Sequence, residues 1–245
     1  MSKTIAIFGA GTGLGTSVAR RFGREGFRVA LVGRRTAPLD ALVTTLAAEG
    51  IEAAAFSADL LETDKIPALV GAITERFGRI DVVEYAPISG STFTPAAELT
   101  ADVLEDLISL YLLTPVELVR AVLPQMLERG DGGILIGHGG SAVEGVPFMS
   151  GFGPVMAAAR NYIYSLHGEL ADKGIYAGTL TVNAMIERSA SHEALTSGAL
   201  EFELPEGAVR PLVDPDDLAD GYWDLFTKRD RVEAILPVAA ADLAA

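Results

Sequence analysis

The sequence contains no cysteine, which excludes disulfide bridges, thiolate metal sites and cysteine nucleophiles. It has only three histidines, His138, His167 and His192, and their spacing is not that of metal ligands. We therefore expect no bound metal. A chain without cysteine is compatible with a reducing compartment.

Basic residues are also scarce: 19 Lys and Arg stand against 33 Asp and Glu, and the formal net charge is −14. Nucleic acids and anionic membranes are bound by clustered Lys and Arg, so neither is an expected partner. The apolar run TIAIF near the N-terminus is followed by glycines too early for a secretion signal or a membrane span. We therefore expect a cytoplasmic protein.

Short apolar segments alternate with amphipathic helical segments along the chain. The seven apolar segments are residues 4–8, 28–32, 52–56, 81–85, 133–137, 176–182 and 232–236. This alternation predicts one α/β domain over residues 1–245, with a single doubly wound, Rossmann-like parallel sheet of about seven strands. Residues 187–213 break the alternation without clear periodicity, and we expect them to form a loop that serves as a substrate lid.

A glycine-rich loop connects the first predicted strand to the first helix. Gly9, Gly11, Gly13 and Gly15 follow the strand directly. Glycines at this place let the backbone turn tightly and approach a pyrophosphate, whose charge is met by the N–H groups at the helix N-terminus. The loop therefore predicts a dinucleotide site.

Two arginines, Arg34 and Arg35, follow the second predicted strand about twenty residues further on. An acidic residue at this point would bind the ribose 2′-hydroxyl of NAD(H), whereas arginine accepts the 2′-phosphate of NADP(H). The pair predicts a preference for NADP(H) over NAD(H).

The glycine spacing, Asp59 after the third strand and the chain length together resemble the short-chain dehydrogenase/reductase family over nearly the whole chain. The resemblance implies that Asp59 and Leu60 lie beside the adenine ring. It also places Ala86 in the family's Asn-Asn-Ala-Gly motif. The expected cofactor-binding residues are Gly9, Gly11, Thr12, Gly13, Leu14, Gly15, Arg34, Arg35, Asp59, Leu60 and Ala86.

The same resemblance carries the family's catalytic tetrad onto four positions of this chain. The asparagine falls on Tyr111, the serine on Gly139, the tyrosine on Phe152 and the lysine on Met156. Phenylalanine cannot protonate the oxygen that becomes an alkoxide when hydride arrives, and a thioether is at most a weak acceptor. We expect Gly139, Phe152 and Met156 to line an apolar substrate pocket.

Four residues are candidates to replace the lost acid: His138, Ser141, Tyr111 and Tyr85. A histidine titrates near neutral pH, and the other three carry hydroxyl groups. Each also has a structural explanation, because strand-end packing, loop hydrogen bonds or local phenol hydrogen bonds would place the same residues there. Glu84 is expected to be paired or solvent-facing.

Three functions remain open from the sequence. The first is an NADP(H)-dependent oxidoreductase whose small apolar substrate is a carbonyl, an imine or a conjugated alkene. The second is a dinucleotide-binding protein without catalysis, and the third is a cofactor-assisted isomerase or cyclase. The resemblance further implies a homodimer or homotetramer that pairs helices near residues 104–127 and 155–170. Arg160, in the second helix, is expected to meet the partner subunit.

Overall fold

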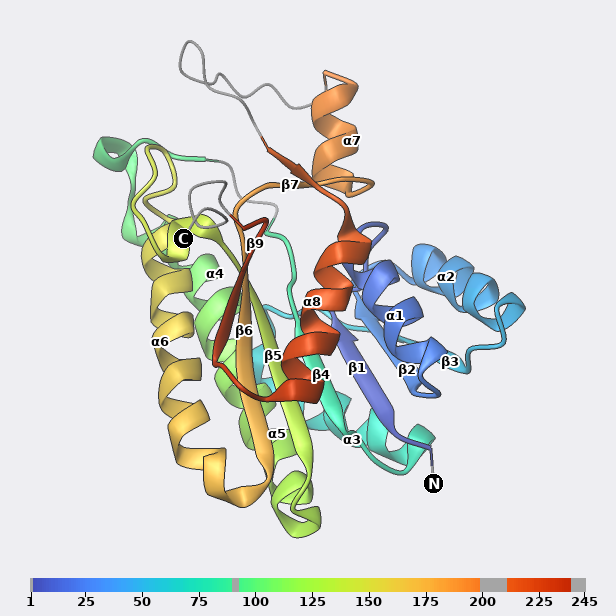
Figure 1. Cartoon of the computed structure of the whole chain (residues 1–245). Coiled ribbons are helices and arrows are strands. Elements are labelled where there is room, and N and C mark those ends of the chain that lie inside the picture. Colours follow the sequence, from blue (N-terminus) through green and yellow to red (C-terminus); the bar gives the residue numbers. More distant parts are fainter. Residues whose placement is uncertain (1, 90–92, 199–210, 239–245) are drawn as a thin grey trace.

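The computed structural model describes residues 2–89, 93–198 and 211–238. They form a seven-stranded sheet in the order β3-β2-β1-β4-β5-β6-β9 (Figure 1). Every neighbouring pair is parallel, which confirms the predicted doubly wound, Rossmann-like sheet. The strands are β1 (Thr4–Phe8), β2 (Arg28–Gly33), β3 (Ala53–Ser57), β4 (Val82–Tyr85), β5 (Gly132–Gly139), β6 (Ile175–Val182) and β9 (Glu233–Leu236).

Helices cover both faces of the sheet (Figure 1). One face packs against α1 (Leu14–Arg24), α2 (Thr36–Ala48) and α8 (Pro215–Lys228). The other packs against α3 (Ile66–Phe77), α4 (Ala101–Ile108), α5 (Thr114–Arg129) and α6 (Phe152–Leu170). The strands are apolar at consecutive positions because successive side chains enter these two cores alternately.

The helical segment from α4 to α5 bends through a π-helical turn at Ser109–Leu113, which contains Tyr111. Among the described residues this segment, Ala101–Arg129, has the length and hydropathy of a membrane span. Leu118 and Val122 on its inner side are fully buried against the sheet. A core helix of a globular domain therefore accounts for its composition. Single π-turns occur often at functional sites, and this one places Tyr111 near the carboxyl ends of the strands.

The described part of residues 187–213 is more ordered than the sequence predicted. A short helix, α7 (Ala190–Thr196), begins at Ser189, whose hydroxyl accepts a hydrogen bond from the backbone N–H of His192. A two-residue ladder joins β7 (Met185–Ile186) to β8 (Leu212–Val213). The segment expected to form a loop thus contains short regular elements, which the sequence did not reveal because elements this short leave no periodicity to detect. Residues 199–210 lie outside the described residues.

Candidate functional site

The glycine loop after β1 is held so tightly that side chains do not fit. Gly9 has φ +97°, and a Cβ atom built on it would lie 2.6 Å from the Cα atom of Pro87, next to Ala86 at the end of β4. A Cβ on Gly15 would lie 2.8 Å from the Cα atom of Ala10. The loop is thus pressed between β4 and the start of α1.

The start of α1 fits an anion. Thr12 and Leu14 flank Gly13, which begins the helix without any side-chain cap. A Cβ on Gly11 would meet only the carbonyl oxygen of Gly9, 3.8 Å away, so the space above this residue is open. The first N–H groups of a helix have no partners within the helix, and such groups suit a pyrophosphate. Here the N–H of Thr16 donates to the carbonyl oxygen of Gly11, which holds the loop against the first turn of α1.

A cavity of about 600 Å³ lies at the ends of β2 and β3. It brings together the predicted residues Arg34 and Asp59. The Asp59 carboxylate accepts a hydrogen bond of 3.0 Å from the backbone N–H of Leu61, which holds it in place. Leu60 is buried, and its carbonyl oxygen accepts from the Thr114 hydroxyl. The remaining lining residues are Ser57, Ala58, Glu62, Lys65, Ile66, Ala68 and Leu69.

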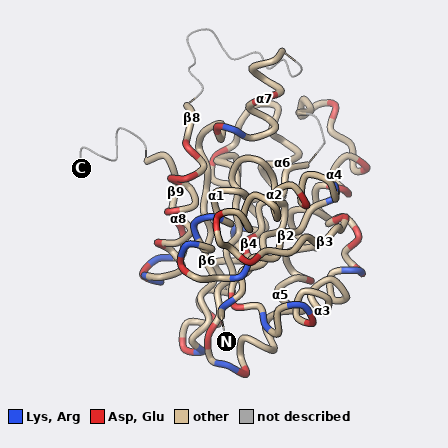
Figure 2. The backbone as a smooth tube through the Cα atoms, turned by 90° about the vertical axis from the view of Figure 1, so that its right-hand side faces the viewer, with Lys and Arg blue, Asp and Glu red and all other residues tan. Residues whose placement is uncertain are grey.

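Arg34 and Arg35 are exposed beside this cavity and directly precede α2. Most described arginines pair with an acid, and basic and acidic positions accordingly lie close together in Figure 2. In contrast, neither the Arg34 nor the Arg35 side chain bonds to any other described residue. Two adjacent cations therefore remain available to an anionic ligand.

The four positions onto which the resemblance places the tetrad, Tyr111, Gly139, Phe152 and Met156, meet at the carboxyl end of β5. Rings of Tyr111 and Phe152 are in edge contact, with centroids 6.1 Å apart, and Phe93 contacts Phe152 at 5.7 Å. A Cβ atom on Gly139 would lie 3.8 Å from the sulfur of Met156. Phe152 and Met156 are one turn apart on α6, and both are buried. These side chains form one apolar wall.

Both candidate phenols make a local hydrogen bond, Tyr85 as a donor and Tyr111 as an acceptor. The Tyr85 hydroxyl donates to the backbone oxygen of Leu110, and the Tyr111 hydroxyl accepts from the N–H of Ser89 at 2.9 Å. Burial raises the pKa of Tyr85 well above its usual value and also raises the pKa of Tyr111. Neither phenol titrates near neutral pH, and both serve the local structure.

His138 is buried, and neither ring nitrogen has a hydrogen-bond partner among the described residues. Burial lowers its pKa to about 4, so the imidazole is neutral at pH 7. Its charged neighbours are Arg160 and Glu233. These two form an ion pair within the chain, with the Arg160 Nε 2.9 Å from Glu233 Oε1. That Arg160 also meets a partner subunit stays a prediction.

Ser141 lies in the short turn after β5, between the strand and α6. Its hydroxyl oxygen is buried and has no partner among the described residues. A Cβ atom built on Gly139 would lie 3.9 Å from this oxygen. Of the four candidates, Ser141 therefore combines an uncommitted hydroxyl with a position beside the apolar wall.

Glu84 differs from expectation because it is completely buried. Burial raises its pKa to about 8, and the neighbouring Tyr222 hydroxyl opposes only part of this rise. Glu84, His138, Ser141 and Tyr222 all have buried side-chain atoms without partners in the described structure. Native proteins contain few such groups. Glu84 and Tyr222 lie on the face of the sheet covered by α8, whereas His138 and Ser141 lie on the face covered by α6, so they form two separate pairs. Sequence reasoning missed the burial of Glu84, although Val82 and Val83 before it and Tyr85 after it were a signal of a buried strand.

The comparisons with known proteins agree with this arrangement. The sequence model of the short chain dehydrogenase family matches residues 3–190. The chain belongs to the short-chain dehydrogenase family. No cluster of three or more His, Asp or Glu side chains suited to a metal occurs in the part of the chain that the structure describes.

Several relatives of this family member are oxidoreductases. A putative ketoacyl reductase of Streptomyces coelicolor is 32% identical over 187 residues, which cover 75% of this chain and 69% of that protein. The oxidoreductase asL5 of Sarocladium schorii is 29% identical over 216 residues, covering 88% and 85%. A short-chain dehydrogenase from Sphingobium yanoikuyae, solved in complex with NADPH, superposes with a TM-score of 0.79 at 28% identity, covering 99% and 91%.

Proposed function

We propose that this short-chain dehydrogenase uses NADP(H) to reduce or oxidise a small apolar substrate, a carbonyl, an imine or a conjugated alkene, without the tyrosine acid of its family. The observation that carries the cofactor preference is the pair Arg34 and Arg35, which have no counter-ion among the described residues and lie beside the cavity that contains Asp59. The apolar wall of Phe152 and Met156, where the family has its tyrosine and lysine, supports the unusual site.

When bound, NADPH supplies a hydride. The N–H groups at the start of α1 would hold its pyrophosphate, and Gly9 and Gly15 would keep the loop close enough for this contact. Arg34 and Arg35 would hold the 2′-phosphate through charge-assisted hydrogen bonds. Phe152 and Met156 exclude water and bind the apolar part of the substrate.

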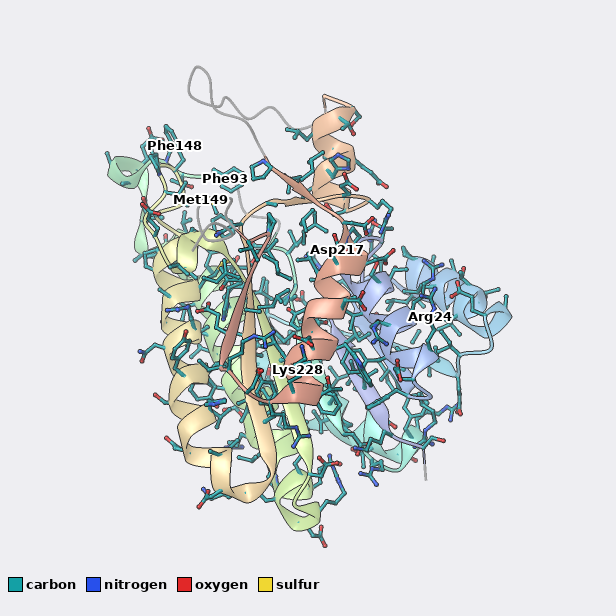
Figure 3. The ribbon with its side chains drawn as sticks, in the orientation of Figure 1. Arg24, Phe93, Phe148, Met149, Asp217 and Lys228 are labelled. Atoms are coloured by element: carbon teal, nitrogen blue, oxygen red, sulfur yellow. The ribbon has the colours of Figure 1, made fainter. Side chains whose placement is uncertain are left out.

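The mouth of the pocket supports an apolar substrate. Figure 3 shows Phe93, Phe148 and Met149 close together above the carboxyl end of the sheet. A bridge between Thr94 and Met149 joins their two loops. Phe148 is 52% exposed and has φ +67°, a backbone conformation that is strained for a bulky residue. An exposed aromatic ring kept at such a cost favours a role in binding over a role in folding.

Residues 187–213 are proposed as the lid over this site. Ser189 packs on the glycine loop, since a Cβ atom on Gly13 would lie 3.1 Å from the Cα and Cβ atoms of Ser189. In Figure 1 the adjacent helix α7 extends beyond the carboxyl end of the sheet, next to the start of α8. The described part of this segment is therefore anchored against the cofactor loop.

The cofactor preference predicts that NADPH binds at least tenfold more tightly than NADH. The 2′-phosphate gains contacts with Arg34 or Arg35 that NADH cannot make, each worth about 1.5–3 kcal/mol. Fluorescence titration of both cofactors into the wild type and Arg34→Ala measures this, and the variant should weaken NADPH binding alone. Arg120→Ala, an exposed arginine on α5, is the control. Equal affinities of the wild type for the two cofactors would remove the basis of the assignment.

The reaction is tested by incubating the protein and NADPH with a panel of carbonyls, imines and conjugated alkenes while following the absorbance of the reduced nicotinamide. Oxidation of NADPH by any member supports the proposal. Tight NADPH binding without oxidation by any member would favour the non-catalytic alternative. Conversion of a compound without net change in NADPH would favour the isomerase or cyclase.

The family resemblance also leads us to expect a homodimer or homotetramer. Leu113 and Leu127 on the segment ending in α5, and Tyr164 on α6, expose 45%, 42% and 37% of their surface. Pairing of these helices across a two-fold axis would cover them. Light scattering should give a mass of at least twice 25.7 kDa at micromolar concentration. A monomer mass would contradict the expectation.

A further inference from the structure

Arg188 lies beside the glycine loop, in the short connection between β7 and α7. The next residue, Ser189, packs on that loop: its N atom lies 3.3 Å and its Cα atom 3.1 Å from where a Cβ atom on Gly13 would be. Consecutive Cα atoms are 3.8 Å apart, so the backbone of Arg188 is one residue away from this contact. Its long side chain therefore starts next to the loop on which we place the pyrophosphate of the cofactor.

The turn that carries Arg188 has an unusual backbone conformation. Arg188 has φ +58°, in the left-handed region that residues with a side chain rarely adopt. The His192 imidazole accepts from the backbone N–H of Arg188 at 3.3 Å, and the Ser189 hydroxyl donates to the carbonyl oxygen of Ile186 at 2.7 Å. These bonds fix the turn to α7 on one side and to β7 on the other. Backbone strain of this kind is concentrated at functional sites.

The Arg188 guanidinium is bound to two carboxylates at the start of α8. Its Nη1 and Nη2 atoms lie 3.1 and 2.5 Å from the two carboxylate oxygens of Asp214, and Nη2 lies 3.2 Å from an oxygen of Asp216. The side chains of Arg188, Asp214 and Asp216 are 51%, 39% and 66% exposed. Water and salt weaken ion pairs at such exposure. Another anion that accepts two hydrogen bonds from a guanidinium, as a phosphate group does, can displace these carboxylates.

We propose that Arg188 is a further binding residue for the pyrophosphate of the cofactor, and that Asp214 and Asp216 compete with the pyrophosphate for its guanidinium. The inference rests on the proposed function, because it requires a dinucleotide on the glycine loop. Arg188 must leave the two carboxylates before it donates to the pyrophosphate, so the acids lower the affinity for the cofactor without binding it. NADPH and NADH both contain the pyrophosphate, so Arg188 does not distinguish them, unlike Arg34 and Arg35.

Arg188→Ala should weaken the binding of NADPH, NADH and ADP-ribose by the same factor, about tenfold, because all three contain the pyrophosphate. Isothermal titration calorimetry at one salt concentration measures the three affinities. The ratio of the NADPH and NADH affinities should stay that of the wild type, whereas Arg34→Ala should lower it. Arg231→Ala is the control: it removes an arginine that is paired with an acid of α8 beyond the other end of that helix, and it should bind all three ligands as the wild type does.

Asp214→Asn should have the opposite effect. Asparagine is as good an N-cap as aspartate and can still accept from the N–H of Asp216, but it lacks the charge that holds Arg188. All three ligands should therefore bind about two- to fivefold more tightly. Asp217→Asn is the matched control, since it removes an equal charge from the same end of α8, where Figure 3 labels it, without an ion pair to Arg188 in the described structure. In the Arg188→Ala background, Asp214→Asn should gain no more than Asp217→Asn does.

Wild-type affinity of Arg188→Ala would overturn the inference. Weaker binding by Asp214→Asn, or binding no tighter than that of Asp217→Asn, would overturn the competition and leave the ion pair a structural role. A loss in Arg188→Ala that is confined to NADPH, or absent with ADP-ribose, would overturn the assignment to the pyrophosphate. If thermal unfolding shows that Asp214→Asn is not folded, Asp216→Asn repeats the test, because this acid holds Arg188 without capping the helix. The proposed function survives each of these results, whereas a wild type that binds neither NADPH nor NADH would overturn both.

Discussion

At pH 8 the variant Glu84→Gln is expected to be about 3 kcal/mol more stable than the wild type. Glu84 is completely buried, and burial raises its pKa from 4.5 to about 8. One pKa unit corresponds to about 1.4 kcal/mol, so ionisation in the unfolded chain but not in the folded chain shifts the equilibrium strongly. Glutamine keeps the shape of the side chain and removes the proton equilibrium.

The direction in which stability changes with pH follows from the direction in which burial shifts the pKa of Glu84. Because the folded pKa is the higher one, the stability that protonated Glu84 contributes is fully present below pH 4.5 and is lost as the pH rises toward 8. His138 acts in the opposite direction: its pKa is lowered to about 4, so it destabilises the fold as the pH falls from 6.5 toward 4. Because both proteins contain His138, its contribution cancels when the free energies of unfolding of the wild type and Glu84→Gln are subtracted.

Chemical denaturation at pH 5, 6.5 and 8 measures the effect, and the advantage of the variant should grow with pH. For a chain of this length, 3 kcal/mol corresponds to a Tm difference of roughly 6–12 °C. Glu98→Gln, at an exposed position, should follow the wild type at every pH. A stability difference that does not depend on pH would show that Glu84 is already ionised in the folded protein.

Gly9→Ala is expected to abolish cofactor binding and to destabilise the fold by about 3 kcal/mol or more. Gly9 combines φ +97° with backbone atoms of Pro87 at 2.6 and 2.8 Å from the position of the new methyl group. Backbone atoms cannot move aside as a flexible side chain can, so β1 and β4 must separate at the glycine loop. NADPH titration and thermal unfolding of the variant measure the two losses.

Substitutions at two other glycines separate backbone strain from steric contact as causes of the loss of stability and cofactor binding. Gly26→Ala places a methyl group at φ +83° with nothing within 4 Å, so it tests the backbone strain alone and should cost about 1 kcal/mol. Gly11→Ala has ordinary backbone angles and open space, so it should fold normally and weaken only NADPH binding. If Gly9→Ala behaves like Gly26→Ala, contact with Pro87 does not limit the loop.

The sheet was predictable because its signals are local. Each strand begins and ends within two residues of the predicted apolar segment. The parallel arrangement follows from the alternation of strands with helices. The elements β7, α7 and β8 were missed, since two-residue strands and a seven-residue helix are shorter than the period that would reveal them. Such elements depend on contacts from distant parts of the chain.

The residues of the site also divide into those that local sequence signals predicted and those that they did not. Arg34 and Asp59 could be placed together from their positions after neighbouring strands, since the carboxyl ends of parallel strands share one edge. The burial of Glu84 and the ion pair of Arg160 with Glu233 could not, because each depends on side-chain packing between elements far apart in the sequence. Ser141 and His138 could be named as candidates, but the sequence could not show that both are buried without hydrogen-bond partners among the described residues.

Arg34 and Arg35 form a small positive spot on a chain whose net charge is −14. An anionic cofactor approaches this protein against long-range repulsion, and the arginines attract it only within about 10 Å at 0.1 M salt. Added salt should therefore speed association by screening the repulsion and also speed dissociation by weakening the short contacts. For such a protein, the preference for a cofactor with a 2′-phosphate resides in slower dissociation of that cofactor rather than in faster association.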